Sequence, residues 1–131
     1  MNRFLPRAGL AIVLPVIGLV GLARVAAAET LISTELERVA DTEVRLQRVT
    51  FPADTALPKH WHPGEEFAYV IDGSITLMLD GAEPLEMTSG EAVKIPAHSL
   101  HSARAGAAGV ELVIFRVHEA GQPERILVED R

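Results

Sequence analysis

Residues 54–73 read DTALPKHWHPGEEFAYVIDG, and the first prediction rests on the histidines in this stretch. His60 and His62 lie two positions apart, and Glu66 follows at another even offset, after a break at Pro63–Gly64. Side chains two residues apart along a β-strand point to the same face, so both imidazoles can reach one ion. The spacing therefore predicts a metal site on a strand, with Glu66 as a carboxylate ligand.

A second stretch supplies the remaining ligand. Residues 90–105 read GEAVKIPAHSLHSARA, and His101 is well placed in sequence to reach the ion from a neighbouring strand. A lone histidine is more often a solvated or hydrogen-bonded side chain, but four of the five histidines fall between positions 60 and 101. The chain has no cysteine, so thiolate sites are excluded, and three imidazoles with one carboxylate leave manganese, iron(II), nickel, copper(II) and zinc as candidate metals.

The chain outside these stretches predicts an all-β domain, because no segment after residue 29 has a long apolar period of 3.6 residues. Ile75, Leu77 and Leu79 alternate with other side chains, and Asp80–Gly81 then indicates a tight hairpin. Further strands are predicted over 42–51, 66–71, 92–95, 100–104 and 110–117, with an edge strand over 30–40 and a short strand near the C-terminus. Turns are predicted at 72–73, 89–90 and 105–109. This spacing is typical of a sandwich or barrel, and a double-sheet jelly roll suits so short a chain.

The strand over residues 42–51 departs from simple alternation. Its apolar positions slip from Val44 and Leu46 to Val49 and Phe51, which indicates either a bulge or an inward-facing Arg48. An inward guanidinium would bind a substrate carboxylate through two hydrogen bonds. The alternative is a surface arginine on a strand edge.

Two further residues are candidates for acid–base catalysis. Glu65 adjoins a predicted ligand and is either a base beside the metal or, as we favour, an outward-facing neighbour. His98 is either a general acid or base at the mouth of the site or a solvated turn residue.

The remaining aromatic side chains and histidine are expected to be structural. Trp61 lies on the strand face opposite the ligands, where packing or a subunit interface is favoured over substrate stacking. Tyr69 and Phe115 are expected in the core, and His118 at the surface.

The N-terminal segment predicts export. Arg3 and Arg7 precede an apolar run over 8–23, which ends before small residues up to Ala28. This is typical of a secretory signal over residues 1–28, cleaved after Ala27 or Ala28, with an uncleaved anchor as the alternative. The two arginines are not adjacent, so the pattern is not a twin-arginine signal. Residues 29–131 are therefore expected to be periplasmic or secreted, without stable insertion in a membrane.

Charge and length narrow the function further. The chain has 131 residues and a net charge of −6, and all eighteen acidic residues lie after position 28, against nine basic ones. A strongly acidic domain repels the phosphate backbone, so nucleic acid is excluded as a partner. The length fits one domain, and the absence of cysteine excludes thiol chemistry.

The two stretches together resemble the motifs of the cupin superfamily, G-x5-H-x-H-x3,4-E-x6-G and G-x5-P-x-G-x2-H-x3-N. Residues 54–73 and 90–105 match them at the four ligand positions and at Gly73, Gly90 and Pro96. Three positions differ: Asp54, His98 and Ala105 stand where the motifs have glycine, glycine and asparagine.

The resemblance implies a jelly-roll barrel, also called a double-stranded β-helix, with one metal held by His60, His62, Glu66 and His101. It also implies a small-molecule ligand and a homodimer. The leading hypothesis is a metal-dependent enzyme acting on a small oxygen-rich organic molecule, similar to a quercetinase-type dioxygenase. The alternatives are a non-redox lyase or isomerase that uses the metal as a Lewis acid, a non-catalytic binding module, and a barrel whose metal is only structural.

Overall fold

The computed structural model describes residues 26–128, and all of its regular elements are strands. The signal predicted over residues 1–28 lies almost entirely outside the described residues. Within residues 26–128, no helix is long and apolar enough to cross a membrane. The strands are β1 (Ala27–Glu35), β2 (Thr42–Phe51), β3 (Ala56–Trp61), β4 (Glu65–Leu79), β5 (Leu85–Thr88), β6 (Ala92–Ile95), β7 (His101–Glu119) and β8 (Ile126–Leu127).

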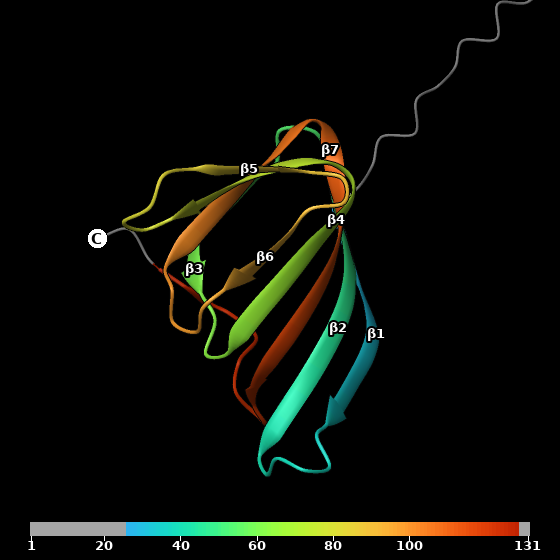
Figure 1. Cartoon of the computed structure of the whole chain (residues 1–131), viewed down its shortest axis with the longest axis vertical. Coiled ribbons are helices and arrows are strands. Elements are labelled where there is room, and N and C mark those ends of the chain that lie inside the picture. Colours follow the sequence, from blue (N-terminus) through green and yellow to red (C-terminus); the bar gives the residue numbers. More distant parts are fainter. Residues whose placement is uncertain (1–25, 129–131) are drawn as a thin grey trace, which may run out of the picture.

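The eight strands form one continuous hydrogen-bonded sheet, which folds over into two packed halves, the two sheets of the barrel (Figure 1). The long strands β4 and β7 each run through both halves. The first half of β4 pairs with β6 and with the second half of β7, which also pairs with β2 and, through it, with β1. The second half of β4 pairs with β5 and with the first half of β7, which also pairs with β3 and, through it, with β8. All pairs are antiparallel, and the two sheets form the predicted jelly roll.

The length of β4 and β7 corrects two predicted turns. Asp72–Gly73 and residues 105–109 lie inside continuous strands, not between separate ones. The pairing of β4 with β7 shifts register on either side of this point, between Val70 and Asp72 and again between Gly73 and Ile75. Gly73 has a φ of 83° and Gly109 one of 78°, so these glycines bend the strands from one sheet into the other without ending them. The hairpin at Asp80–Gly81 is confirmed, because β5 pairs with β4 beyond it.

The predicted edge strand is confirmed as β1, although it begins at Ala27 and ends at Glu35. The expected bulge within residues 42–51 is wrong, since all ten residues of β2 pair with β7 without a shift. The register shift of this region lies in β1, between Thr30 and Ile32. The apolar pattern slips in β2 because the buried Gln47 occupies an inward position, where its side chain bonds Arg116.

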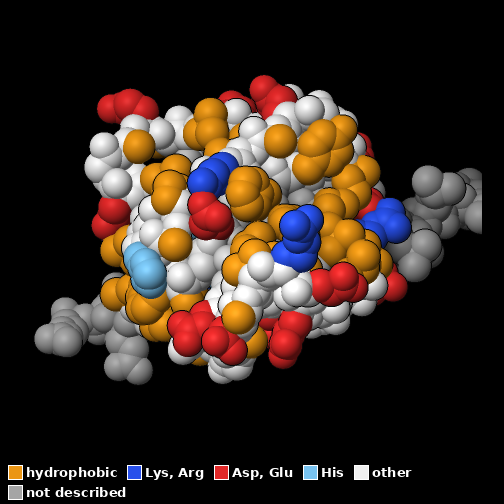
Figure 2. Space-filling view, turned by 60° about the horizontal axis from the view of Figure 1, so that its bottom comes forward, with side chains coloured by type: hydrophobic (Ala, Val, Ile, Leu, Met, Phe, Trp, Pro, Cys, Tyr) orange, Lys and Arg blue, Asp and Glu red, His pale blue; other side chains and the backbone are white. Residues whose placement is uncertain are grey.

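The inner faces of the two sheets carry the apolar core, which includes the fully buried Val70 and Val110. The outer face of β4 and β7 corrects another expectation. Tyr69 and Phe115 are 47% and 36% exposed, and they lie with Phe67 on the outside of the barrel. Figure 2 shows one face of the molecule, on which hydrophobic side chains lie among acidic and basic ones.

Candidate metal centre

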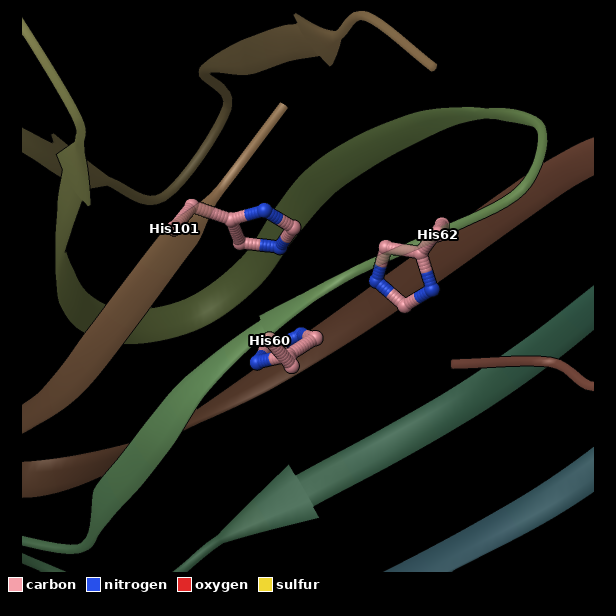
Figure 3. A group of neighbouring side chains, drawn as sticks. All are labelled: His60, His62 and His101. Carbon is pink, nitrogen blue, oxygen red and sulfur yellow. The ribbon is translucent and has the colours of Figure 1, made fainter. Parts of the chain in front are cut away.

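Strand pairing brings the three predicted histidine ligands together. His60, near the end of β3, is the register partner of His101, the first residue of β7. His62 follows β3 by one residue and faces the same side as His60. Figure 3 shows the three rings turned toward one another. All three side chains are buried, and one nitrogen from each ring lies within 4.8 Å of the others.

Main-chain carbonyls fix the orientation of each ring. The Nδ1 atom of His60 lies 2.8 Å from the Pro58 carbonyl oxygen, and that of His101 lies 2.8 Å from the Ser99 carbonyl oxygen. The Nδ1 atom of His62 lies 2.6 Å from the carbonyl oxygen of Glu124. A carbonyl can only accept, so each Nδ1 carries a proton, and in a neutral ring Nε2 then keeps its lone pair. This is the arrangement by which proteins prepare imidazoles to bind a metal.

Burial keeps two of these rings neutral. It lowers the pKa of His60 to about 4, although the Pro58 carbonyl acts in the opposite direction. Burial also lowers the pKa of His101, against the effect of the Ser99 carbonyl. Neutral imidazole is the form that binds metals, so at neutral pH these side chains need lose no proton first.

Glu66 reaches the cluster from β4, where Arg116 of β7 is its register partner. Its Oε2 accepts a hydrogen bond from Arg116 Nε at 2.7 Å and lies 3.0 Å from His62 Nε2. Burial raises the pKa of Glu66, but the neighbouring His62 and Arg116 outweigh this effect and lower the pKa to about 2. The carboxylate is therefore ionised throughout the neutral range.

The contact between His62 and Glu66 tests whether a cation fits. Nε2 of His62 is buried and has no hydrogen-bond partner among the described residues. When Nδ1 carries the only proton of this ring, Nε2 is an acceptor that faces a carboxylate oxygen, also an acceptor. Two acceptors 3.0 Å apart repel each other unless a proton or a metal ion lies at the site. The donor set of three imidazoles and a nearby carboxylate suits a divalent transition metal.

The polar residues around Glu66 were missed by sequence reasoning. Arg116 Nη1 donates to Gln47 Oε1 and to Glu124 Oε1, so the buried guanidinium joins three side chains, Glu66 among them. One signal was available for Arg116, because it follows Leu112 and Ile114 at even spacing and therefore shares their inward face. No local pattern marks Glu124, which lies in an irregular segment after β7.

The histidine cluster lies on the wall of a cavity of about 510 Å³ inside the barrel. Such a volume is within the usual range for small-molecule sites. Apart from the histidines and Glu66, the charged or polar lining residues lie on β2, β7 and the C-terminal segment, and they are Gln47, Arg116, Glu124 and Arg125. The other walls are mainly apolar, with Val49, Ile75, Leu77, Met87, Leu112 and Ile114 among them. The cavity can therefore take a molecule with an apolar body and a polar head.

The three candidates for catalysis lie elsewhere. The inward orientation considered for Arg48 is wrong: its side chain is 54% exposed and pairs with Glu111. Glu65 faces outward and pairs with Lys94. His98 is exposed, and its ring lies 5.3 Å from that of Trp61 on the outside of the barrel. None of these side chains lines the cavity within the described part of the chain.

The surface position expected for His118 is also wrong. Its side chain is buried, with an exposed fraction of 5%, because even positions of β7 after Val110 face inward. Gly64 packs directly against it: a Cβ atom on Gly64 would come within 2.5 Å of the His118 Cβ.

Two departures from the motif pattern occur where the backbone is left-handed. Asp54 has a φ of 58° and His98 one of 61°, at positions where the motifs have glycine. The backbone therefore keeps the conformation that a glycine would favour, although the residue is not glycine. Ala105, the third departure, lies within β7, and its amide donates to the Thr55 carbonyl oxygen at 2.9 Å.

Comparisons with known proteins agree with this architecture. Residues 47–117 match the family model described as a cupin domain. No curated protein matches the chain. Among solved structures, the DMSP lyase DddQ of Ruegeria pomeroyi has a TM-score of 0.66 and 21% identity, covering 79% of this chain and 51% of that one. A Bacillus subtilis oxalate decarboxylase mutant has a TM-score of 0.65 and 17% identity, covering 81% of this chain and 29% of that one.

A third solved structure, a cupin superfamily protein of Desulfitobacterium hafniense, is closer in size. Its TM-score is 0.56 and its identity 15%, with 74% of this chain and 83% of that chain covered. This chain spans about half the length of the DMSP lyase. At these identities, the structural likeness establishes the barrel fold and leaves the reaction open.

Proposed function

We propose, since this chain belongs to the cupin family, that it is a metal-dependent enzyme acting on a small molecule with an apolar body and an oxygen-bearing head. The observation that carries the proposal is the convergence of three buried imidazoles, each with Nδ1 held by a carbonyl, on the wall of an apolar cavity. His60, His62 and His101 would hold the ion, with Glu66 as the fourth ligand. A bound divalent ion would supply Lewis acidity and, if redox-active, access to dioxygen chemistry.

The surrounding residues would perform the other tasks. Arg116 keeps Glu66 ionised and oriented toward His62. The apolar walls would bind the body of the substrate. Arg125 lines the cavity and makes no ion pair within the described residues, so its guanidinium is available to an oxygen anion of the substrate.

We favour an oxidative, dioxygenase-like reaction. Besides Glu66 and Arg125, the charged residues of the cavity are Arg116 and Glu124, and these two are paired with each other. An acid–base lyase or isomerase needs a side chain that exchanges a proton near neutral pH. Within the described lining, no lysine or tyrosine is present to do so. A lining without such a side chain favours substrates that the metal itself activates, such as catechols, flavonoids and β-diketones.

The test is reconstitution of the metal-free protein separately with manganese, iron(II), nickel, copper and zinc, followed by oxygen uptake with these substrates. Turnover with redox-active ions only is the expected result. Equal turnover with zinc would replace oxidation by Lewis-acid chemistry, and tight ligand binding without turnover would leave a binding module. Failure of every metal to bind at about one per chain would overturn the proposal. His98→Ala is the matched control for His60→Ala, because His98 is exposed and outside the cavity.

The proposal includes export and cleavage of the N-terminal segment, supported by the basic residues, apolar run and small residues that end at Ala28. β1 begins at Ala27, so a cut after Ala27 or Ala28 would fall at the start of this strand. N-terminal sequencing of the protein from the periplasm tests this. A chain that still begins at residue 1 in the membrane fraction would support the uncleaved anchor instead.

A further inference from the structure

The chain after β7 turns back along the polar end of the cavity, where Glu124 and Arg125 line it. Residues 120–128 form this C-terminal strap, which lies beyond the matched residues 47–117. At one end, the Ala120 amide donates to the Asp41 carbonyl at 2.9 Å. At the other end, β8 pairs with His60 and Trp61 of β3, and the Val128 amide donates to the Lys59 carbonyl at 3.2 Å. The strap thus ends beside one of the predicted metal ligands.

Glu124, in the middle of the strap, touches the candidate site with both its backbone and its side chain. Its carbonyl oxygen is the partner of His62 Nδ1, at 2.6 Å. Its carboxylate Oε1 accepts from Arg116, the residue that holds Glu66. Glu124 therefore contacts the predicted ligand His62 directly and the predicted ligand Glu66 through Arg116.

The charges around Glu124 favour a carboxylate there, in addition to Glu43 beside Arg45 and Glu66 beside Arg116. Arg45 of β2 and Arg116 of β7 are register partners, and like charges directly opposite each other destabilise a sheet. Glu124 joins the two cations, since Oε1 accepts from Arg116 and Oε2 lies 3.1 Å from Arg45 Nη1. Within the described part of the strap, no other side chain makes a hydrogen bond or ion pair to the barrel.

We propose that Glu124 is a positioning residue for the metal centre, and that the strap is part of the site. Its carboxylate fastens the strap to Arg45 and Arg116, and this attachment places its carbonyl against His62. Without the carboxylate, the carbonyl of residue 124 is no longer held against Nδ1 of His62, and Arg116 loses one of the acceptors that hold it beside Glu66. This inference rests on the proposed function, because it concerns the ligands of that metal.

The experiment measures cobalt(II) and zinc affinity of the full-length chain with Glu124→Ala and Glu124→Gln. Loss of an outer contact to a metal ligand weakens binding by roughly 10–100-fold, and this is the result expected for Glu124→Ala. The amide of Glu124→Gln can still accept from one arginine, so a smaller loss is expected. Glu119→Ala is the matched control, because Glu119 is exposed and its side chain makes no hydrogen bond or ion pair within the described residues.

A second readout separates positioning from general stability. The Nδ1 proton of His62, observed by NMR in metal-free and zinc-loaded protein, should be protected in the unaltered chain and in Glu119→Ala, and should exchange rapidly in Glu124→Ala. Unchanged cobalt affinity together with a protected His62 proton in Glu124→Ala would overturn the inference. If the unaltered chain binds no metal, the proposed function fails, while the NMR of the metal-free form still tests Glu124. If Glu124→Ala does not fold, Glu124→Gln decides.

Discussion

The imidazoles of the candidate centre are oriented for metal binding by carbonyl groups from several different residues. A carbonyl oxygen holds the Nδ1 proton of each ring, and burial keeps His60 and His101 neutral. The ionised Glu66 adds negative charge beside His62. At the scale of the residue, the site combines imidazole donors with one anion, which would leave a divalent ion with residual positive charge for a substrate.

The ligand assignment predicts the effect of removing single donors. His60→Ala should no longer bind one metal ion per chain. Its affinity should fall by more than the roughly 10–100-fold typical of losing a residue that only contacts a metal ligand. Glu66→Gln should also weaken binding, because a neutral amide replaces the carboxylate. Elemental analysis after dialysis measures both. If both variants keep wild-type stoichiometry and affinity, the assignment is wrong.

The histidines also predict how the metal-free protein responds to acid. The pKa of His60 is about 4 in the fold, below the ordinary value of 6.5, so the unfolded chain binds this proton more readily. The free energy of unfolding should therefore fall as the pH drops from 6.5 toward 4, and it should not depend on this group above that window. Glu66, with a pKa of about 2 against 4.5, extends the loss to lower pH. Urea unfolding at a series of pH values measures this, and His60→Ala should flatten the upper part of the curve.

Two arginines on inward and outward positions provide a contrast. Arg116→Ala would leave Glu66 buried without its partner, and breaking a buried ion pair costs about 3–5 kcal/mol. Arg48→Ala removes an exposed pair with Glu111, whose contribution to stability is about 0–1 kcal/mol. Chemical denaturation compares the two variants. Equal losses would contradict the inward position of Arg116.

At the scale of the element, β7 organises the site. It pairs with β2, β3 and β4, so that it carries His101 opposite His60 and Arg116 opposite Glu66. The ligands come from strands that are neighbours in space, and the bends in β4 and β7 place them on the inside of the barrel. The connection between β3 and β4 must therefore be compact, and Gly64 allows its backbone to pack closely against β7.

Gly64 predicts a steric effect on this connection. A Cβ atom there would lie 2.0 Å from the Val117 carbonyl oxygen, so the backbone must shift, and overpacking costs about 1–3 kcal/mol. Gly106→Ala is the matched control, because its new Cβ would meet Ser74 Oγ at 2.0 Å, and a hydroxyl can rotate away. Thermal unfolding should show a larger loss for Gly64→Ala. It should also weaken metal binding, since Gly64 lies between His62 and Glu66.

At the scale of the whole molecule, the barrel encloses a cavity, and its outer face leaves aromatic side chains exposed. Phe67, Tyr69 and Phe115 gather on the outside of β4 and β7, beside Lys94. An exposed apolar patch is a common feature of a protein interface. The predicted homodimer remains a prediction, and this face is where we place it.

The homodimer is tested by the mass of the protein in solution. Light scattering should give about twice the mass of one chain, and Tyr69→Lys should shift the protein toward the monomer without changing its metal content. Glu83→Lys, on an exposed residue of the turn after β4, is the control. A monomer at all concentrations would contradict the prediction.

The sequence by itself determined the barrel and the clustering of the three histidines, because both follow from patterns among residues that are close together in the chain. Alternation indicates strands, the spacing of His60 and His62 places both rings on one face, and two motifs resemble those of a known family. It misplaced Tyr69, Phe115 and His118 and left Arg48 undecided, because alternation within a strand does not reveal which of its two faces turns inward.

Only the tertiary structure decided which charges surround the site. Arg116 lies 50 residues from Glu66 along the chain, and Glu124 lies 62 residues from His62. Such partners are set by strand register and by the return of the C-terminal strap across the barrel, and neither leaves a pattern among neighbouring residues. Local periodicity determines the elements, whereas long-range pairing determines which side chains meet.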